Sequence, residues 1–179
     1  MPATLEIEAI TDQHAFNRRR WKEIASDPAL ARIEGRIEMD RHGHILMTPP
    51  PGFYHADRQA DVLAELRRLL PTGGKARPEV PVSTAAGIRA ADVAWISDLR
   101  LKGALADDLL MVAPEICIEI LSPSNTRAEI EEKRALYFDA GADEVWICDL
   151  EGRLFFFLKA APGEAAARSA LCPDFPAAV

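Results

Sequence analysis

Two acidic residues stand in the middle of segments that otherwise have the composition of buried strands. Asp92 lies within residues 89–97 among alanine, valine and tryptophan, and Glu119 lies within the isoleucine-rich residues 114–122. A charge among apolar side chains is costly unless it is paired, so each acid needs a partner. One such acid alone would most simply be a structural carboxylate that pairs with an arginine. Two of them on successive strands indicate a shared site.

Side chains alternate along residues 114–122, and this alternation places Glu119 on the strand face that the isoleucines do not occupy. Ile116, Ile118 and Ile120 share one face, and Cys117 and Glu119 share the other. Neighbouring strands bring the Cβ atoms of opposite residues to roughly 5 Å, so the two carboxylates could bind one hard cation. Mg²⁺ takes one or two carboxylates and completes its shell with water and phosphate oxygens. The pattern therefore predicts a site for Mg²⁺ or Mn²⁺.

A basic side chain and a phenol follow on the next predicted helix. Glu129, Lys133 and Tyr137 are spaced i, i+4, i+8 and share one stripe of that helix. A surface pair between Glu129 and Lys133 would explain the spacing alone. The functional interpretation places Lys133 beside the cation, where it stabilises charge on a reacting phosphate, with Tyr137 in support.

Helices and strands alternate along the chain in the manner of one α/β domain. Hydrophobic periodicity, caps and turn residues predict helices and strands in this order: helix 11–26, hairpin 36–47, helix 55–70, strands 79–84, 89–97 and 114–122, a helix between Thr126 and Gly141, and a hairpin over 144–159. No linker divides them, so we expect a single domain over residues 1–179. Its mixed β-sheet would be flanked by helices, an α/β (α+β) arrangement.

Charge and cysteine content exclude several classes of protein. The 21 basic and 28 acidic residues give a net charge of −7, which argues against a protein that coats DNA non-specifically. Twelve of the acids and only three bases lie in residues 103–151. The three cysteines are widely spaced and form no zinc-ribbon motif. No signal-peptide pattern and no apolar run of about 18 residues is present, so we expect a cytoplasmic protein without membrane contact.

The order of the acids resembles a known nuclease signature. Asp92 followed by Glu119-Ile120-Leu121 on the next strand is similar to the PD-(D/E)XK motif, with Ala91 in place of proline and Leu121 in place of lysine. Residues 114–153 more specifically resemble the Uma-two family, bacterial proteins regarded as restriction endonucleases. The matching elements beyond Glu119 are Leu121 to Ser124, Glu132-Lys133, Tyr137, Ala140-Gly141, Glu144 to Trp146 and Asp149. Looser counterparts include Trp21, Arg36 to Glu38, Gly43, Met47 to Pro50, His55, Ala91 to Val93 and the tail 169–176.

The resemblance implies a fold, a chemistry and a set of roles. The fold would be a restriction-endonuclease-like core with an N-terminal helix and β-hairpin. Asp92 and Glu119 would be metal ligands, and Glu38 would be an additional acid of the site. Lys133 would replace the missing strand lysine from the following helix. The activity implied is a magnesium-dependent DNA endonuclease that acts as a homodimer.

Basic residues in the middle of the chain are the expected DNA contacts. Residues 51–102 hold eight bases and six acids and are the only sizeable segment with a positive balance. The candidates are Arg58, Arg67, Arg77 and Arg89, together with His55, Arg18 to Arg20, Arg68 and Lys75. Two alternatives stay open. One is a catalytically inactive nuclease-like fold that binds nucleic acid or assembles with itself, and the other is a metal hydrolase that cleaves a small phosphate ester.

Overall fold

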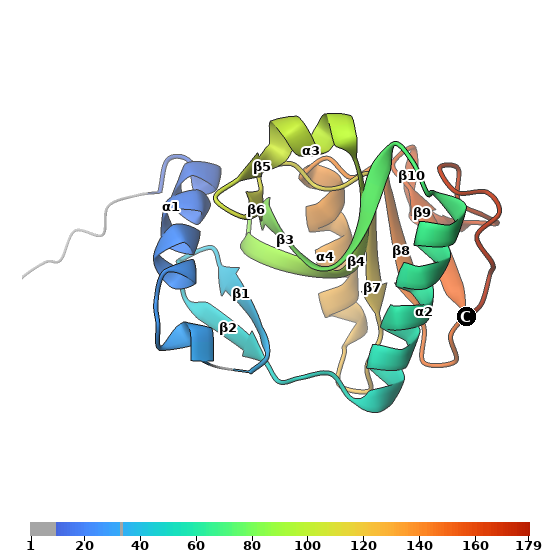
Figure 1. Ribbon diagram of the computed structural model, residues 1–179, viewed down its shortest axis with the longest axis horizontal. Helices are drawn as coiled ribbons and strands as arrows, with labels where there is room; N and C mark the ends of the chain where they lie inside the picture. The colour runs from blue at the N-terminus through green and yellow to red at the C-terminus, as the bar shows by residue number, and fades with distance from the viewer. Residues whose placement is uncertain (1–9, 33) are drawn as a thin grey trace, which may run out of the picture.

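The N-terminal part of the molecule is a helix packed on a β-hairpin, as the sequence predicts. The computed structural model describes residues 10–32 and 34–179 (Figure 1). Helix α1 (Gln13–Ala25) starts at Asp12, whose side chain accepts a hydrogen bond from the Ala15 amide. A short 3₁₀ turn (Leu30–Arg32) leads to β1 (Arg36–Asp40), which pairs antiparallel with β2 (Ile45–Thr48). The apolar face of α1 packs against Met39 and Ile88, which ties the hairpin to the central sheet.

The middle of the chain forms one helix and a long antiparallel pair of strands. Helix α2 (Phe53–Leu69) precedes β3 (Gly74–Thr84) and β4 (Gly87–Ser97). The turn between the two strands needs Gly87, because its φ is +106° and a Cβ added there would lie 2.1 Å from the carbonyl oxygen of Met39. Helix α3 (Asp98–Ala104), β5 (Leu105–Ala106) and β6 (Leu109–Leu110) were not predicted, because elements this short carry no readable periodicity.

The C-terminal half contains a parallel strand–helix–strand unit. Strand β7 (Ile116–Ile120), helix α4 (Arg127–Asp139) and β8 (Glu144–Cys148) follow one another, and β8 pairs parallel with β7. Thr126 and Glu129 form the predicted capping box at the start of α4. Strand β9 (Leu154–Leu158) pairs antiparallel with β8, and β10 (Ala161–Ala166) pairs with β9 at the sheet edge. The alanine-rich β10 was not predicted, because its composition favours no strand.

Helices cover both faces of the mixed sheet, whose main path runs β10-β9-β8-β7-β4-β3-β6-β5. Figure 1 shows α2 on one side of β7 and β8 and α4 on the other. The isoleucine face of β7 packs against Val62 and Leu66 of α2. Cys117 on the opposite face packs in the cluster that contains Tyr137 of α4. The predicted division of β7 into two faces is therefore confirmed, and Glu119 lies on the α4 side.

The three cysteines are all buried and free. Burial raises the pKa of the Cys117 and Cys172 thiols, and it raises the pKa of Cys148 to about 11. In the described residues, no helix is both long and apolar enough to cross a membrane.

Candidate active site

A cavity of about 990 Å³ opens where several elements meet at one end of the sheet. Strand β1, the proline loop after β2, the start of α2 and the loop between β7 and α4 form its walls. Among the carboxylates that line it, three buried ones come from three strands, namely Glu38 from β1, Asp92 from β4 and Glu119 from β7. Their side chains are deeply placed, since the residues are only 7%, 1% and 3% exposed.

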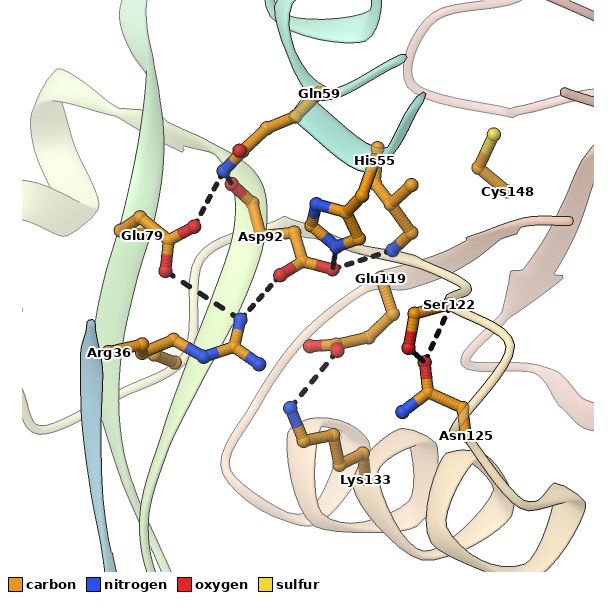
Figure 2. A network of polar contacts seen from close by, with 12 residues as sticks. Arg36, His55, Gln59, Glu79, Asp92, Glu119, Ser122, Asn125, Lys133 and Cys148 are labelled. Atoms are coloured by element: carbon orange, nitrogen blue, oxygen red, sulfur yellow. Dashed lines mark hydrogen bonds and ion pairs between the residues drawn. The ribbon is translucent and has the colours of Figure 1, made fainter. Parts of the chain in front are cut away.

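Strand register explains why the two central acids meet. Strands β4 and β7 are antiparallel, and Val93 pairs with Ile118. Asp92 and Glu119 are the next residues on the two strands beyond this pair, and the Asp92 carboxylate accepts a hydrogen bond from the Ile120 amide. Figure 2 shows the two carboxylates near each other, and both residues line the cavity. The structure therefore brings together the pair of acids that the sequence singled out.

The amine of Lys133 lies between two of the carboxylates. Its Nζ is 3.0 Å from Oε1 of Glu38 and 3.0 Å from Oε2 of Glu119. The phenol of Tyr137, one turn further along α4, donates a 2.7 Å hydrogen bond to Oε1 of Glu119. Glu129 accepts a hydrogen bond from the Thr126 amide at the helix start. Lys133 thus points into the site and pairs with the strand acids.

Asp92 is held by a ring of donors. Its Oδ2 accepts a 2.7 Å hydrogen bond from the amide of Ile120 and lies 3.3 Å from Nε2 of His55. Its Oδ1 accepts from Nη1 of Arg36. Burial alone would raise the pKa of Asp92, but the hydrogen bond from His55, the charge of Arg36 and the Ile120 amide outweigh burial and lower it. Asp92 is therefore an anion at neutral pH.

Glu119 differs from Asp92 in its proton affinity. Burial, opposed by the charge of Lys133 and reinforced by the charge of Asp92, raises the pKa of Glu119 to about 7. Burial lowers the pKa of Lys133, yet the charges of Glu119 and Glu38 outweigh this effect and raise it. The site thus concentrates negative charge that an additional cation would stabilise.

Arg36, Gln59 and Glu79 complete the site, and none of them has a role predicted from the sequence. Nη1 of Arg36 lies 3.6 Å from Oε2 of Glu79. The amide of Gln59 donates 2.7 Å hydrogen bonds to Oε1 of Glu79 and to the backbone carbonyl of Asp92 (Figure 2). Arg36 shares a strand face with Glu38, and Gln59 follows His55 by one helical turn, but neither spacing alone marks a functional residue.

The predicted DNA contacts divide into two groups. His55 and Arg89 line the cavity, and Nη1 of Arg89 donates to the carbonyl of Met39. The other eight candidates, which include Arg18 to Arg20, Arg68 and Lys75, do not line it. Arg67 and Arg77 both donate to the carbonyl of Ala76, and Arg58 lies beside Gly152. A role for Arg58, Arg67 and Arg77 in binding DNA stays a prediction.

The donor set of the cavity fits a hard divalent cation. Among residues 10–32 and 34–179, no group of three or more His, Cys, Asp or Glu side chains is placed so that it could hold a metal ion, so a bound ion would have two protein carboxylates and complete its shell with water or substrate oxygens. The cavity offers two opposed carboxylates, with a third beside Lys133. Mg²⁺ and Mn²⁺ prefer such oxygen donors, and Mg²⁺ usually retains several waters.

Comparisons with known proteins identify the fold and the family of the chain. A crystal structure described as a putative nuclease belonging to DUF820 from Anabaena variabilis is similar, with a TM-score of 0.62 and 20% sequence identity. The match covers 77% of this chain and 80% of that chain, and it shows a nuclease-like α+β fold. A comparison with curated proteins finds no match. The model of the Uma2 family, described as "Putative restriction endonuclease", matches residues 21–171, and the chain therefore belongs to the Uma2 family.

Proposed function

We propose that this protein is a divalent-cation-dependent endonuclease that hydrolyses phosphodiester bonds in DNA. The observation that carries the proposal is the convergence of Glu38, Asp92, Glu119 and Lys133 on one cavity from four separate elements. Paired carboxylates beside a single lysine are a donor set suited to phosphoryl chemistry. Membership of a family described in terms of restriction endonucleases supports nucleic acid as the substrate class.

Each side chain has a distinct role in this proposal. Asp92 and Glu119, assisted by Glu38, would hold Mg²⁺ or Mn²⁺. A bound cation of this kind supplies Lewis acidity to a phosphate oxygen and lowers the pKa of water. Lys133 stabilises the negative charge that develops on the phosphate. Tyr137 fixes the orientation of the Glu119 carboxylate through its 2.7 Å hydrogen bond, and His55 does the same for Asp92.

The direct test is metal-dependent cleavage of DNA by the purified protein. We expect nicking in Mg²⁺ or Mn²⁺, none in excess EDTA, and a loss of about 100-fold or more in Asp92→Asn. Asp107→Asn is the matched control, because Asp107 pairs with Arg18 outside the cavity. Equal nicking by wild type and Asp92→Asn would identify a contaminating nuclease and refute the proposal. Small phosphodiesters in the same assay would separate a DNA endonuclease from a hydrolase of small phosphate esters.

A second candidate function rests on Leu121. This residue packs against the core where the signature would have a lysine, so the site depends wholly on Lys133 from α4. A nuclease-like fold that binds nucleic acid or assembles with itself, without cleaving, would tolerate this loss. Calorimetric titration with Mn²⁺ distinguishes the two functions. An active site should bind the ion and lose that binding in Glu119→Ala, whereas an inactive relic need not bind it.

The proposed enzyme would act as a homodimer in the cytoplasm. A two-fold dimer places two sites on one duplex, one for each strand. Size-exclusion chromatography with light scattering should then give twice the chain mass. A strict monomer would contradict this part of the proposal and leave the single-site chemistry intact.

A further inference from the structure

Arg36 occupies the centre of the acidic cluster and has no assigned role. It lies on β1 two residues before Glu38, and its side chain is 20% exposed. Nη1 donates to Asp92 and lies 3.6 Å from Glu79. These contacts occupy one terminal nitrogen of the guanidinium group, and they orient its plane within the cavity.

The opposite edge of the same guanidinium group makes an ion pair with Glu38 but no hydrogen bond among the described residues. Its Nε is buried, has no hydrogen-bond partner, and lies 3.8 Å from Oε1 of Glu38. Among the described residues, the hydrogen bond of the Arg36 side chain is made by Nη1. Figure 2 shows the other terminal nitrogen directed toward the space between Glu119 and Lys133. The N–H groups of Nε and Nη2 form the fork that binds carboxylate or phosphate with two parallel hydrogen bonds.

A second half-buried arginine shows what a purely structural guanidinium group looks like in this fold. Arg100 is 23% exposed, close to the value for Arg36. Its Nε lies 3.2 Å from Glu115, Nη1 donates to two backbone carbonyls, and Nη2 donates to Asp143. Every nitrogen of Arg100 therefore has a partner. The Nε atom of Arg36, in contrast, is buried without a hydrogen bond and lies at the longer distance of 3.8 Å from Glu38.

The surroundings hold Arg36 in this orientation at some conformational cost. Glu79 has a φ of +50°, in the left-handed region that side chains other than glycine rarely adopt. Its carboxylate receives a 2.7 Å hydrogen bond from Gln59, which also donates to the Asp92 carbonyl. Strained backbone of this kind concentrates at functional sites, where the surrounding contacts maintain it.

We propose that Arg36 is a substrate ligand whose Nε–Nη2 edge binds the non-bridging oxygens of the phosphate that is cleaved. Lys133 and Arg36 then approach that phosphate from α4 and β1, and together they offset the three carboxylates. The inference rests on the proposed phosphodiesterase function and deepens it, because it assigns a second cation to the substrate.

Arg36→Lys tests the fork, because lysine keeps the charge and loses the paired donors. We expect kcat/KM for DNA cleavage in Mn²⁺ to fall about 100-fold, while calorimetric Mn²⁺ affinity stays within about threefold. Arg36→Ala should lose more activity and should recover about tenfold with added ethylguanidinium but not with ethylammonium. Arg100→Lys is the control, with a lower Tm and a kcat/KM per folded molecule within about twofold of wild type.

The outcomes separate this inference from the function on which it rests. A wild type that neither cleaves DNA nor binds Mn²⁺ refutes both. A wild type that cleaves, with Arg36→Lys within about twofold of it, refutes only the role of Arg36. An equal loss of Mn²⁺ affinity and kcat/KM in Arg36→Lys would mean that Arg36 acts through Asp92, and it would overturn the proposed substrate contact. Failure of ethylguanidinium to restore activity to folded Arg36→Ala would overturn it as well.

Discussion

Glu119 and Glu144 are buried glutamates on adjacent parallel strands, yet their surroundings are opposite. They are 3% and 2% exposed and lie on β7 and β8 respectively. Glu144 accepts hydrogen bonds of 2.7 to 2.8 Å from neutral donors only: the indole of Trp146, the hydroxyl of Ser169 and the amides of Ala170 and Leu171. Glu119 contacts the ammonium of Lys133, the phenol of Tyr137 and a cavity shared with other acids.

The contrast shows how one residue type serves structure or chemistry in the same sheet. Both Glu144 oxygens are filled by fixed donors, so this carboxylate ties the C-terminal tail to β8 and does not line the cavity. The oxygens of Glu119 face charged groups that a ligand could rearrange. A buried acid therefore becomes a candidate catalytic group through its neighbours and its access to a cavity, and burial alone does not identify it.

Glu119→Gln should give the largest effect on activity. The amide keeps the shape of the side chain but removes the charge that would hold a cation, so we expect cleavage to fall about 10³-fold. Thermal stability should fall, because the amide leaves Lys133 with one buried carboxylate fewer. Initial rates at saturating Mg²⁺, together with thermal unfolding, measure both effects. A rate within about tenfold of wild type would place Glu119 with Glu144 among the structural acids.

Lys133→Met should separate catalysis from metal binding. The neutral side chain has a similar length, and we expect cleavage to fall about 100-fold because charge on the phosphate is no longer stabilised. The affinity for Mn²⁺ should not decrease, since a competing cation leaves Glu38 and Glu119. Kinetics and calorimetry on the same preparation test this, with the exposed Lys102→Met as control. Weaker Mn²⁺ binding would show that Lys133 organises the carboxylates.

Glu144→Gln should lower the stability of the protein and leave its activity nearly unchanged. The amide nitrogen would face the donors of Trp146 and Ser169, so we expect a loss of about 3 kcal/mol in the free energy of unfolding. Activity per folded molecule should stay near that of wild type, because Glu144 lies outside the cavity. Urea titration of this variant and of the exposed Glu151→Gln measures the difference. Equal stability of the two variants would contradict the structural role assigned to Glu144.

Tyr137→Phe should give the smallest effect of the series. It removes one 2.7 Å hydrogen bond from Glu119 without changing the volume of the core, so we expect a stability loss of about 1 kcal/mol. Cleavage should fall only a few-fold, because the carboxylate keeps Lys133 as a partner. Urea unfolding and initial rates would detect both changes. A loss of activity as large as that of Glu119→Gln would assign the phenol a direct part in the reaction.

The central acids could be found from the sequence because strand alternation is a strong local rule. Apolar neighbours on both sides marked Asp92 and Glu119 as exceptional, and the antiparallel pairing of β4 with β7 brings both to the same end of that ladder. The capping box at Thr126 fixed the start of α4, so the stripe that carries Lys133 and Tyr137 could be placed on the helix. The spacing allowed Lys133 to reach the acids but did not require it.

The rest of the site depends on contacts between distant segments, which no local pattern encodes. Gln59, Glu79 and Arg36 come from α2, β3 and β1, and their sequence neighbours do not distinguish them from surface polar residues. Glu144 gave no signal either, because its donors lie 25 residues or more along the chain, apart from Trp146. The excess of basic residues in 51–102 does not distinguish Arg89, which lines the cavity, from Arg67 and Arg77, which donate to the Ala76 carbonyl.

The burial of all three cysteines makes the molecule suited to site-specific labelling. Cys117, Cys148 and Cys172 are inaccessible, and burial raises the pKa of each thiol, so reagents that need an exposed thiolate should leave them unmodified. A cysteine introduced at the exposed Ser124, which lines the mouth of the cavity, would then be the preferred site of attachment. A fluorophore placed there would report the arrival of a nucleic acid without removal of any native residue of the core.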